Sequence, residues 1–409
     1  MESTHAISDA GVNRISFERT DDQRELVAVA RAFAQERLRP AADAMQREMS
    51  EGGIGAWRLP DGLLAEASAA GLLTYAIPEA DGGGGLDPVT SAMLMEELTA
   101  GDPGLASLLG SAQLFAGGIL AAGDAIDPDV RAHWLGRICD PAGAFAAIAF
   151  SEPHAGSDLA NIRTRAVAEG DDWVLTGEKT WITGAMPGTT AMLVFARTGG
   201  AGAGGVSAFI VPGDAEGVTY QKLDLMGLRT SYTGQVFLDG VRVPGDHVVG
   251  GIDAGFLVAM RFFAHSRPQV AASALGIGRA AFEHAVQYAN EREAFGKPIM
   301  ARQGVSFMLA DMGMQLEAAR ALIWRACDAA ARGEDVGLIG SYAKAFASDV
   351  AMRVTTDAVQ VLGGAGLSAD HPVERWMRDA KVLQIVEGTN QVQRLIASRY
   401  YAQGQVDVP

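Results

Sequence analysis

Hydrophobic periodicity changes twice along this chain of 409 residues, and this change restricts the fold more than any other feature of the sequence. Over residues 21–139, apolar residues recur at intervals of three and four, as on one face of a helix. Over residues 144–249, short runs of β-forming residues alternate with Gly and Pro, and over residues 256–402 the helical spacing returns. We therefore predict an α+β multidomain fold with an N-terminal helical domain (residues 1–143), a central antiparallel, β-barrel-like domain (144–255) and a C-terminal four-helix bundle (256–409).

Individual elements follow from the same patterns. A first helix is predicted over residues 21–40, because acidic residues open it and Pro40 ends it. Further helices are predicted over residues 59–73, 87–100, 278–295, 305–333 and 341–363, and strands over residues 172–183, 190–198, 206–212 and 234–243.

Two glycine motifs do not indicate nucleotide binding. Residues 200–205 match the pattern G-x-G-x-x-G, but a dinucleotide fingerprint requires a helix next, and here another strand follows. We interpret this segment as a hairpin loop. Gly276 and Gly278 lie within a helical pattern and indicate close packing between helices. A nicotinamide cofactor bound by a Rossmann unit is therefore not supported.

The composition restricts the class of partner. Hydrophobic residues make up 48% of the chain and charged residues 20%, which is typical of a globular protein. A formal net charge of −16 argues against nucleic acid and against an anionic membrane surface as partners. The two cysteines provide neither a disulfide framework nor a Cys-rich zinc site. Because the N-terminus lacks the features of a signal peptide, we expect a cytoplasmic protein.

A glutamate near the C-terminus is the strongest candidate for a chemical role. Glu387 follows an apolar run and precedes Gly388, so its carboxylate can be desolvated, which raises the pKa of a carboxyl group towards the range useful to a base. The same local sequence is also compatible with Glu387 being an ordinary glutamate on the surface or at a helix cap. On local sequence alone, Trp181 also fits the core of the β domain, and Arg292 also fits a charge on a helix surface.

Four segments that are distant in the sequence carry a recognisable combination of residues. They are Phe150–Asp158, Glu178–Gly184, Arg292–Pro298 with Gln303, and a C-terminal group formed by Gln360–Gly366, Arg378–Lys381 and Glu387–Gln391. In this order and with this helix–strand–helix layout, the segments resemble those of the acyl-CoA dehydrogenases over nearly the whole chain. The C-terminal third is especially similar to the medium-chain members.

The resemblance implies a role for each matched residue. Glu387 would be the base that removes the substrate α-proton, and its backbone N–H would help to bind the thioester carbonyl. The positions matched to FAD binding are Phe150, Ser151, Trp181, Thr183, Arg292, Phe295, Gln303, Gln360, Gly364, Thr389 and Gln391; of these, Arg292, Phe295, Gln303, Gln360 and Gly364 would serve the FAD of a neighbouring subunit. The positions matched to substrate binding are Ser157, Phe263, Arg267 and Gly388. No metal site is implied.

The function implied by the resemblance is FAD-dependent α,β-dehydrogenation of an acyl thioester, on CoA or an acyl carrier protein, in fatty acid metabolism. This reaction requires a base for the α-proton, a hydride acceptor such as flavin N5, and donors that stabilise the developing enolate. A homotetramer built as a dimer of dimers and an electron-transfer flavoprotein as acceptor are also implied. An oxygen-using oxidase, a monooxygenase and a non-catalytic subunit on the same fold remain as alternatives.

Several positions depart from the common pattern of the family. Val386 replaces the aromatic residue that usually precedes the base, which predicts a roomier or differently shaped pocket beside the thioester. Ser151 keeps the hydroxyl of the usual Thr, Gly184 stands where Asn is common, and Ala264 stands where Asp is common. Some branches of the family carry their catalytic glutamate at the position that matches Ser266. A serine there cannot act as the base. The acyl group therefore stays undetermined at the level of sequence.

Overall fold

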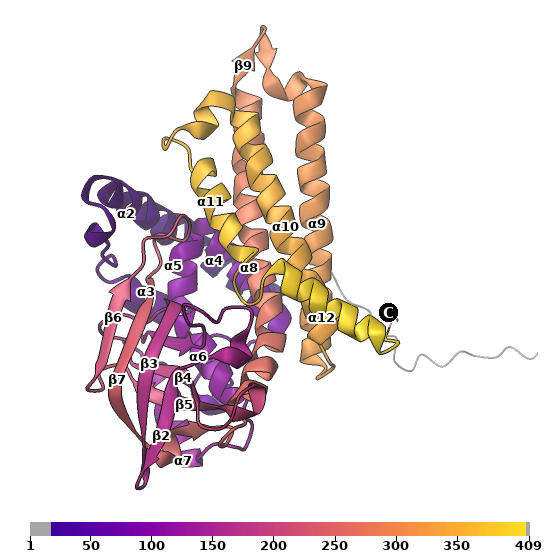
Figure 1. The fold of residues 1–409 in the computed structure, drawn as a ribbon. Coiled ribbons are helices and arrows are strands. Elements are labelled where there is room, and N and C mark those ends of the chain that lie inside the picture. Colours follow the sequence, from indigo (N-terminus) through magenta and orange to yellow (C-terminus); the bar gives the residue numbers. More distant parts are fainter. Residues whose placement is uncertain (1–17, 406–409) are drawn as a thin grey trace, which may run out of the picture.

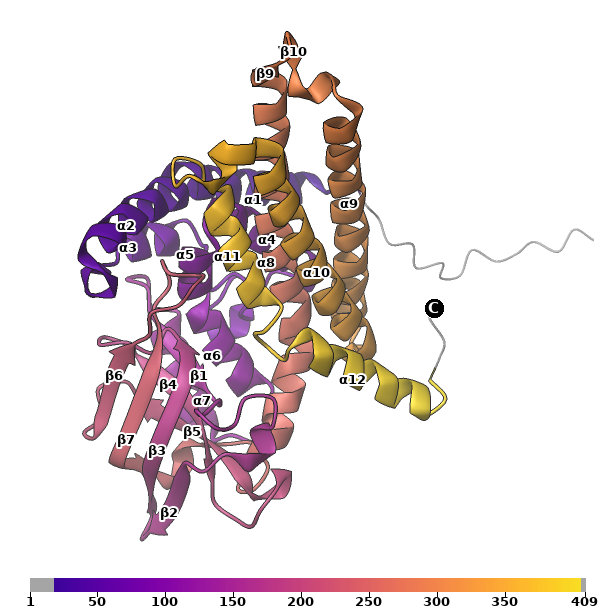
Figure 2. The same cartoon turned by 45° about the horizontal axis from the view of Figure 1, so that its top comes forward.

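The computed structural model describes residues 18–405 and consists of the three expected parts (Figure 1, Figure 2). Helices form the N-terminal part, a β-sheet forms the middle part, and long helices form the C-terminal part. The predicted fold class is confirmed. Within residues 18–405, no single helix has the length and apolar composition needed to span a membrane. The helices Pro103–Leu109 and Ser111–Leu120 pass that test as a bent pair, by length and composition only.

The N-terminal part consists of short helices, of which α4 is buried on nearly all sides. The helices are α1 (Asp21–Phe33), α2 (Arg39–Gly52), α3 (Leu63–Ala69), α4 (Pro88–Gly101), α5 (Pro103–Leu109), α6 (Ser111–Leu120) and α7 (Pro128–Ile138). Asp87 caps α4 by accepting hydrogen bonds from the next turn, as favoured N-cap residues do. Two buried glutamates of α4 are paired: Glu96 with Arg320 (2.8 Å) and Glu97 with Arg279 (2.7 Å). These ion pairs join the N-terminal part to the C-terminal bundle.

The prediction that the first helix ends at Pro40 was wrong. A π-helical segment (Ala34–Leu38) follows α1, and α2 begins at Arg39, so the chain stays helical through the proline. Pro40 occupies the first turn of α2, where its missing N–H needs no intrahelical partner. The wider π turn absorbs the break that a proline causes inside a regular helix.

The central part contains one eight-stranded sheet, which is open and mixed rather than a closed antiparallel barrel. The strands are β1 (Ala146–Ala149), β2 (Arg165–Glu169), β3 (Asp172–Thr183), β4 (Ala191–Arg197), β5 (Val206–Pro212), β6 (Val218–Lys222), β7 (Thr233–Pro244) and β8 (Val248–Val249), and their order is β6-β7-β3-β2-β4-β5-β8, with β1 beside β4. Strands β1 and β2 both run parallel to β4. The sheet stays open because β6 and β8 stand at opposite ends and do not pair.

The glycine-rich loop joins β4 to β5 as predicted. These strands pair antiparallel, with Arg197 opposite Val206, so residues 200–205 form a hairpin connection. Both strands are almost fully buried, because one face packs on α6, α7 and the start of the helix Gly255–Glu291, and the other face packs on side chains of the other strands. The dinucleotide fingerprint is excluded, since no helix follows the loop.

The C-terminal part is a helical bundle in which α8, α9, α10 and α11 pack together (Figure 2). Its elements are α8 (Gly255–Glu291), the hairpin of β9 (Glu293–Ala294) and β10 (Lys297–Pro298), α9 (Gln303–Ala331), α10 (Gly337–Leu362), α11 (Val373–Leu383) and α12 (Asn390–Ala402). The predicted close approach of glycines is confirmed at Gly276. A Cβ built there would lie 2.1 Å from Thr99 Oγ1 and 2.3 Å from the Glu96 carbonyl oxygen of α4.

The variant Gly276→Ala is therefore expected to destabilise the protein by about 1–3 kcal/mol, because a methyl group forces α4 and α8 apart. The apparent melting temperature measured by circular dichroism should fall. Gly304→Ala in α9 is the matched control, since a Cβ there has no neighbour within 4 Å. An equal effect of both substitutions would contradict the close packing.

Candidate active site

Glu387 lies in the turn between α11 and α12, where its side chain meets α8. The Ser266 hydroxyl donates a hydrogen bond to Glu387 Oε2. The Glu387 backbone is left-handed (φ 55°), a conformation that costs a residue with a Cβ about 1–3 kcal/mol. Neighbouring side chains hold it in place. Gln393 Nε2 donates to the carbonyls of Glu387 (3.1 Å) and Gly388 (2.8 Å), and Lys344 Nζ donates to Gly388 O (2.9 Å).

Burial is the largest influence on the Glu387 carboxyl group. Desolvation raises its pKa above the ordinary value, while the Ser266 hydrogen bond and the charges of Arg267 and Lys344 lower it. The residue keeps some accessible surface in the single chain, so a ligand could reach it. Because the pKa is raised, the carboxyl group stays protonated to a higher pH than an exposed glutamate, and its basic form accumulates as the pH rises through that value.

Two cations are buried beside this carboxylate. Burial lowers the pKa of Arg267 and lowers that of Lys344 to about 8, although the charge of Glu387 opposes both shifts. Within residues 18–405, Arg267 Nε has no hydrogen-bond partner. Two positive groups against one negative group favour negative charge that develops on a nearby ligand.

An aromatic cluster forms a wall where the sheet meets α8. The Phe150 ring stacks on Phe195, with 4.3 Å between ring centroids, and lies parallel to Phe263 at 6.3 Å. Phe150 of the β domain and Phe263 of the C-terminal bundle, both predicted for the site, thus lie close together. Buried Lys179 supports this wall by donating to the Phe150 carbonyl (3.1 Å) and to Glu152 Oε1 (2.7 Å).

Trp181 lies at an irregularity in the pairing of strand β3, and its side chain is exposed. The pairing of β3 with β7 shifts register between Lys179 and Ile182, and Trp181 has a φ of 63°. Its side chain is 57% exposed, so the alternative that it fills the β-domain core is wrong. Thr183 lies two residues further and its hydroxyl hydrogen-bonds the Thr233 hydroxyl (3.1 Å). The exposed indole of Trp181, with the Thr183 hydroxyl two residues away, could hold a flat ring system such as that of a flavin.

Five of the remaining cofactor candidates do not join this group within one chain. Arg292, Phe295 and Gln303 lie at the β9–β10 end of the bundle, opposite the sheet, and Gln360 and Gly364 lie at the same end where α10 finishes (Figure 1). All five are exposed, and Phe295 is 94% exposed with a φ of 54°.

Three further candidates lie nearer to Glu387 or to the aromatic wall. Thr389 caps α12 by accepting a hydrogen bond from the Val392 N–H (3.2 Å), and Gln391 is exposed in the first turn of that helix. Ser157 is exposed in the loop that follows Phe150 and Ser151.

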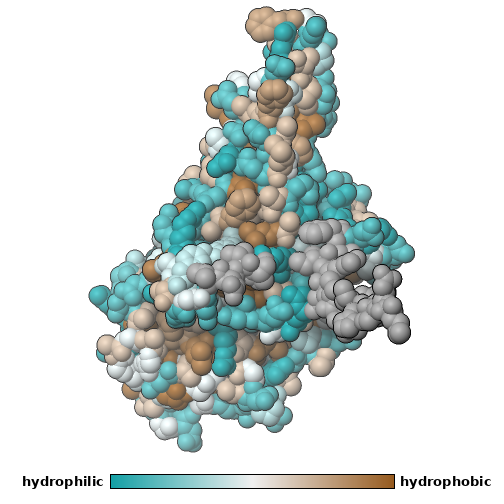
Figure 3. All heavy atoms as spheres, turned by 90° about the vertical axis from the view of Figure 1, so that its right-hand side faces the viewer, coloured by the Kyte–Doolittle hydropathy of each residue, from teal (hydrophilic) through white to brown (hydrophobic). Residues whose placement is uncertain are grey.

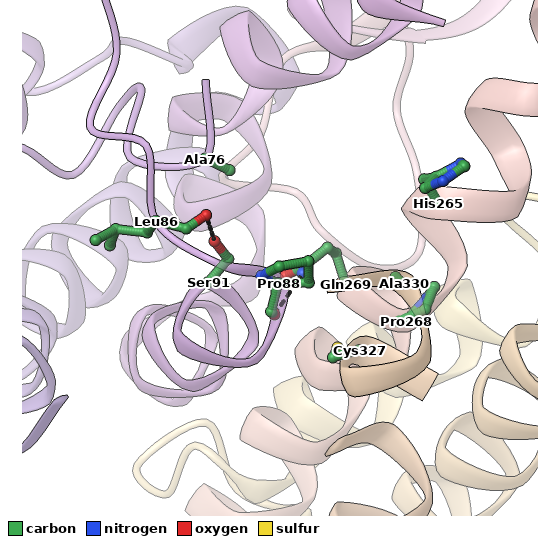
Figure 4. Close-up of a pocket in the computed structure, with 9 residues that line it drawn as sticks. All are labelled: Ala76, Leu86, Pro88, Ser91, His265, Pro268, Gln269, Cys327 and Ala330. Atoms are coloured by element: carbon green, nitrogen blue, oxygen red, sulfur yellow. Dashed lines mark hydrogen bonds between the residues drawn. The ribbon is translucent and has the colours of Figure 1, made fainter. Parts of the chain in front are cut away.

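A small cavity is a separate feature. It measures about 180 Å³ and lies between α4, α8 and α9 (Figure 4). Its walls are Ala76, Leu86, Pro88, Ser91, His265, Pro268, Gln269, Cys327 and Ala330. No residue predicted for catalysis or binding lines this cavity, so we do not assign it to the reaction.

Comparison with known proteins identifies this fold as that of an oxidoreductase. The chain matches three family models, described as the N-terminal domain (residues 20–141), the middle domain (residues 147–241) and the C-terminal domain (residues 253–401) of acyl-CoA dehydrogenase. It is 41% identical to a probable acyl-CoA dehydrogenase of Mycobacterium leprae, over 94% of this chain and 96% of that protein. The chain belongs to the acyl-CoA dehydrogenase family, whose members are flavoproteins that dehydrogenate acyl thioesters.

Solved structures agree with this assignment. Butyryl-CoA dehydrogenase from Megasphaera elsdenii superposes with a TM-score of 0.87 at 35% identity, covering 95% of this chain and all (100%) of that one. A chain from a structure described as the electron transferring flavoprotein of Acidaminococcus fermentans gives a TM-score of 0.87 at 36% identity, covering 94% and 99% of the two chains. The enzyme class inferred from the resemblance is thereby confirmed.

Sequence reasoning missed the partners of Glu387. Ser266 was considered only as a residue that cannot replace the base, and Lys344 and Gln393 were not considered. One signal was present for Lys344, which is a single cation between alanines in the run Ala343 to Ala347. A lysine in such a small-residue helix face is buried only when an acceptor is available.

Ser266→Ala should raise the pKa of Glu387 further, because the lost hydrogen bond stabilises the carboxylate. The acid side of the pH profile of kcat/KM should move to higher pH, and activity in the acid range should fall by about tenfold, given the usual strength of a hydrogen bond to a charged group. Ser273→Ala is the control, since that hydroxyl donates only to Gln269 O in the same helix (3.1 Å). An unmoved profile in Ser266→Ala would show that this hydrogen bond is not made in the working enzyme.

Proposed function

We propose that this protein catalyses FAD-dependent α,β-dehydrogenation of a fatty acyl thioester in the cytoplasm, with Glu387 as the base that removes the α-proton. The observation that carries the proposal is the carboxylate itself, which is desolvated, held by Ser266 and fixed on a left-handed turn. A base is most effective when its pKa lies near the working pH, and desolvation moves a carboxyl group in that direction.

Protein groups also stabilise the charge that develops on the thioester oxygen. The backbone N–H of Glu387 is our proposed donor to that oxygen, and the buried cations Arg267 and Lys344 favour negative charge nearby. Gly388 and Phe263 are the proposed contacts to the substrate, and Ser157 the proposed contact to its carrier. Val386 in place of the usual aromatic residue leaves room for a branched or cyclic acyl group.

The cofactor is the second part of the proposal. When bound, FAD supplies the acceptor for the hydride that leaves Cβ. Phe150, Ser151, Trp181 and Thr183 would hold its ring. The exposed indole and the left-handed backbone of Trp181 support this fit. We propose an electron-transfer flavoprotein as the next acceptor, because one similar chain comes from a structure described by that name.

Glu387→Gln should abolish anaerobic bleaching of the flavin by acyl-CoA, since the amide cannot take the proton. We expect a rate loss of about 10²–10⁴-fold. The measurement is stopped-flow flavin absorbance on variants that retain FAD, with a panel of chain lengths. Glu374→Gln is the control, because that residue is paired with Arg378 of the same helix, α11. Near-normal bleaching in Glu387→Gln would remove the proposed mechanism.

We propose a homotetramer in which the exposed end of one bundle completes the FAD site of a neighbour. Apolar residues are exposed on α9, α10 and α12, namely Phe307, Met314, Phe346, Leu395 and Tyr401. Figure 3 faces the side of α9 and α12 and shows hydrophobic side chains among the hydrophilic ones along the bundle. Several exposed large apolar residues in one region are typical of a surface that another chain covers.

Arg292→Ala should lower the content of FAD per chain and weaken the oligomer, because a guanidinium is lost from the proposed diphosphate site. The flavin-to-protein absorbance ratio after gel filtration and the mass by analytical ultracentrifugation test this. Arg24→Ala is the control, since Arg24 is an exposed residue of α1 paired with Asp21. Unchanged FAD content and mass would count against the contribution from a neighbouring subunit.

A further inference from the structure

A buried lysine supports the turn that carries Glu387. Lys344 has no exposed surface (0%), and its Nζ donates to the Gly388 carbonyl (2.9 Å) and to Asn390 Oδ1 (2.9 Å). Burying an ammonium group is costly unless its hydrogen bonds are satisfied. Here both acceptors come from the segment that immediately follows Glu387, so the cost of burial is offset only when that segment adopts this conformation.

The second acceptor is itself fixed from several sides. Asn390 Nδ2 donates to Asp349 Oδ1 (2.7 Å) and to Ser348 Oγ (2.9 Å), both of α10. Gln384, before the turn, donates to the same Asp349 Oδ1 (2.7 Å). One face of α10 therefore anchors the chain on both sides of Glu387.

We propose that Lys344 is a positioning residue for the reaction, and this rests on the proposed function of Glu387. Its ammonium group binds the Gly388 carbonyl and thereby fixes the peptide plane and the left-handed turn that aim the Glu387 carboxylate and N–H at the thioester. Without that hydrogen bond Gln393 is left to restrain the two carbonyls of the turn, and we expect the strained backbone to shift, since a left-handed residue with a Cβ keeps its conformation only under constraint. A displacement of about 1 Å at a reacting group can cost about a hundredfold in rate.

The same ammonium group acts on Glu387 through its charge. It lowers the pKa of the carboxyl group, in opposition to desolvation. The charged and titratable groups that face this pair are Arg267 of α8, which also lowers the pKa of Glu387 and disfavours the Lys344 cation, and Asp349 of α10, which favours that cation. Tyr400 of α12 faces Arg267. Removing Lys344 thus leaves Arg267 as the remaining cation that stabilises the carboxylate.

Lys344→Met and Lys344→Arg separate position from charge. Methionine has a similar volume but lacks both the charge and the hydrogen bonds. Arginine keeps the charge, but its planar guanidinium cannot take the place of the compact ammonium group that donates to both Gly388 O and Asn390 Oδ1. Three quantities are measured per bound flavin with an acyl-CoA: the rate of anaerobic bleaching against substrate concentration, the exchange of α-protons in D₂O, and the pH dependence of both. Lys222→Met is the control, because burial also lowers the pKa of Lys222 to about 8 and this residue lies in the β domain.

In Lys344→Met we expect kcat and α-proton exchange to fall by about tenfold to a hundredfold, with a small change in KM. The acid side of the pH profile should move to higher pH. In Lys344→Arg the profile should stay in place while kcat falls by about tenfold. Lys222→Met should match the wild type in each quantity.

A folded Lys344→Met variant with the wild-type rate per flavin and pH profile overturns the inference, even if its melting temperature or FAD content is reduced. If Lys344→Met does not fold, a wild-type kcat in Lys344→Arg overturns it. Failure of the wild type to bleach with any acyl thioester would instead refute the proposed function. These two failures are therefore distinguishable.

Discussion

The arrangement of the site depends on the length and rigidity of α8. This helix has 37 residues and packs against α4, α9, α10 and α11, as well as against β5 and α6. Near one end it carries Phe263, Ser266 and Arg267, and it ends next to Arg292. At 1.5 Å per residue, Arg267 and Arg292 are about 37 Å apart along the axis. One chain therefore holds these two groups far apart, which is consistent with our proposal that a second copy completes the cofactor site.

Backbone strain marks the same places independently of the side chains. Among residues 18–405, non-glycine residues with a positive φ are Trp181, Leu228, Asp253, Phe295 and Glu387. Three of these five residues were predicted for the site from the sequence. Strained residues persist where the surrounding structure holds them, and they are common where a ligand requires one particular geometry. For Glu387 the constraint is visible in the hydrogen bonds of Gln393 and Lys344 to the turn.

The sequence predicted the elements better than their assembly. Strand β3 matched the predicted range, because alternation and turn residues act over a few neighbours. The helix that continues through Pro40 and the open, mixed sheet were missed, since both depend on packing between distant segments. Glu387 was found through its resemblance to a family and its apolar neighbours. Its partners Ser266 and Lys344 lie 121 and 43 residues away in sequence, counted as 387 − 266 and 387 − 344, and no local pattern connects them to it.

On the proposed role of Glu387 as the base, two opposed requirements explain why it has these partners. A base must be poorly solvated to bind a proton strongly, yet it must be ionised at the working pH before it can accept one. Burial meets the first requirement by raising the pKa, and the Ser266 hydroxyl with the cations Arg267 and Lys344 meets the second by lowering it. Because the cations are themselves buried, burial also lowers their pKa values, so each charge depends on the others. The turn that carries Glu387 thus combines two tasks, since the lysine that restrains its backbone also adjusts the proton affinity of its carboxylate.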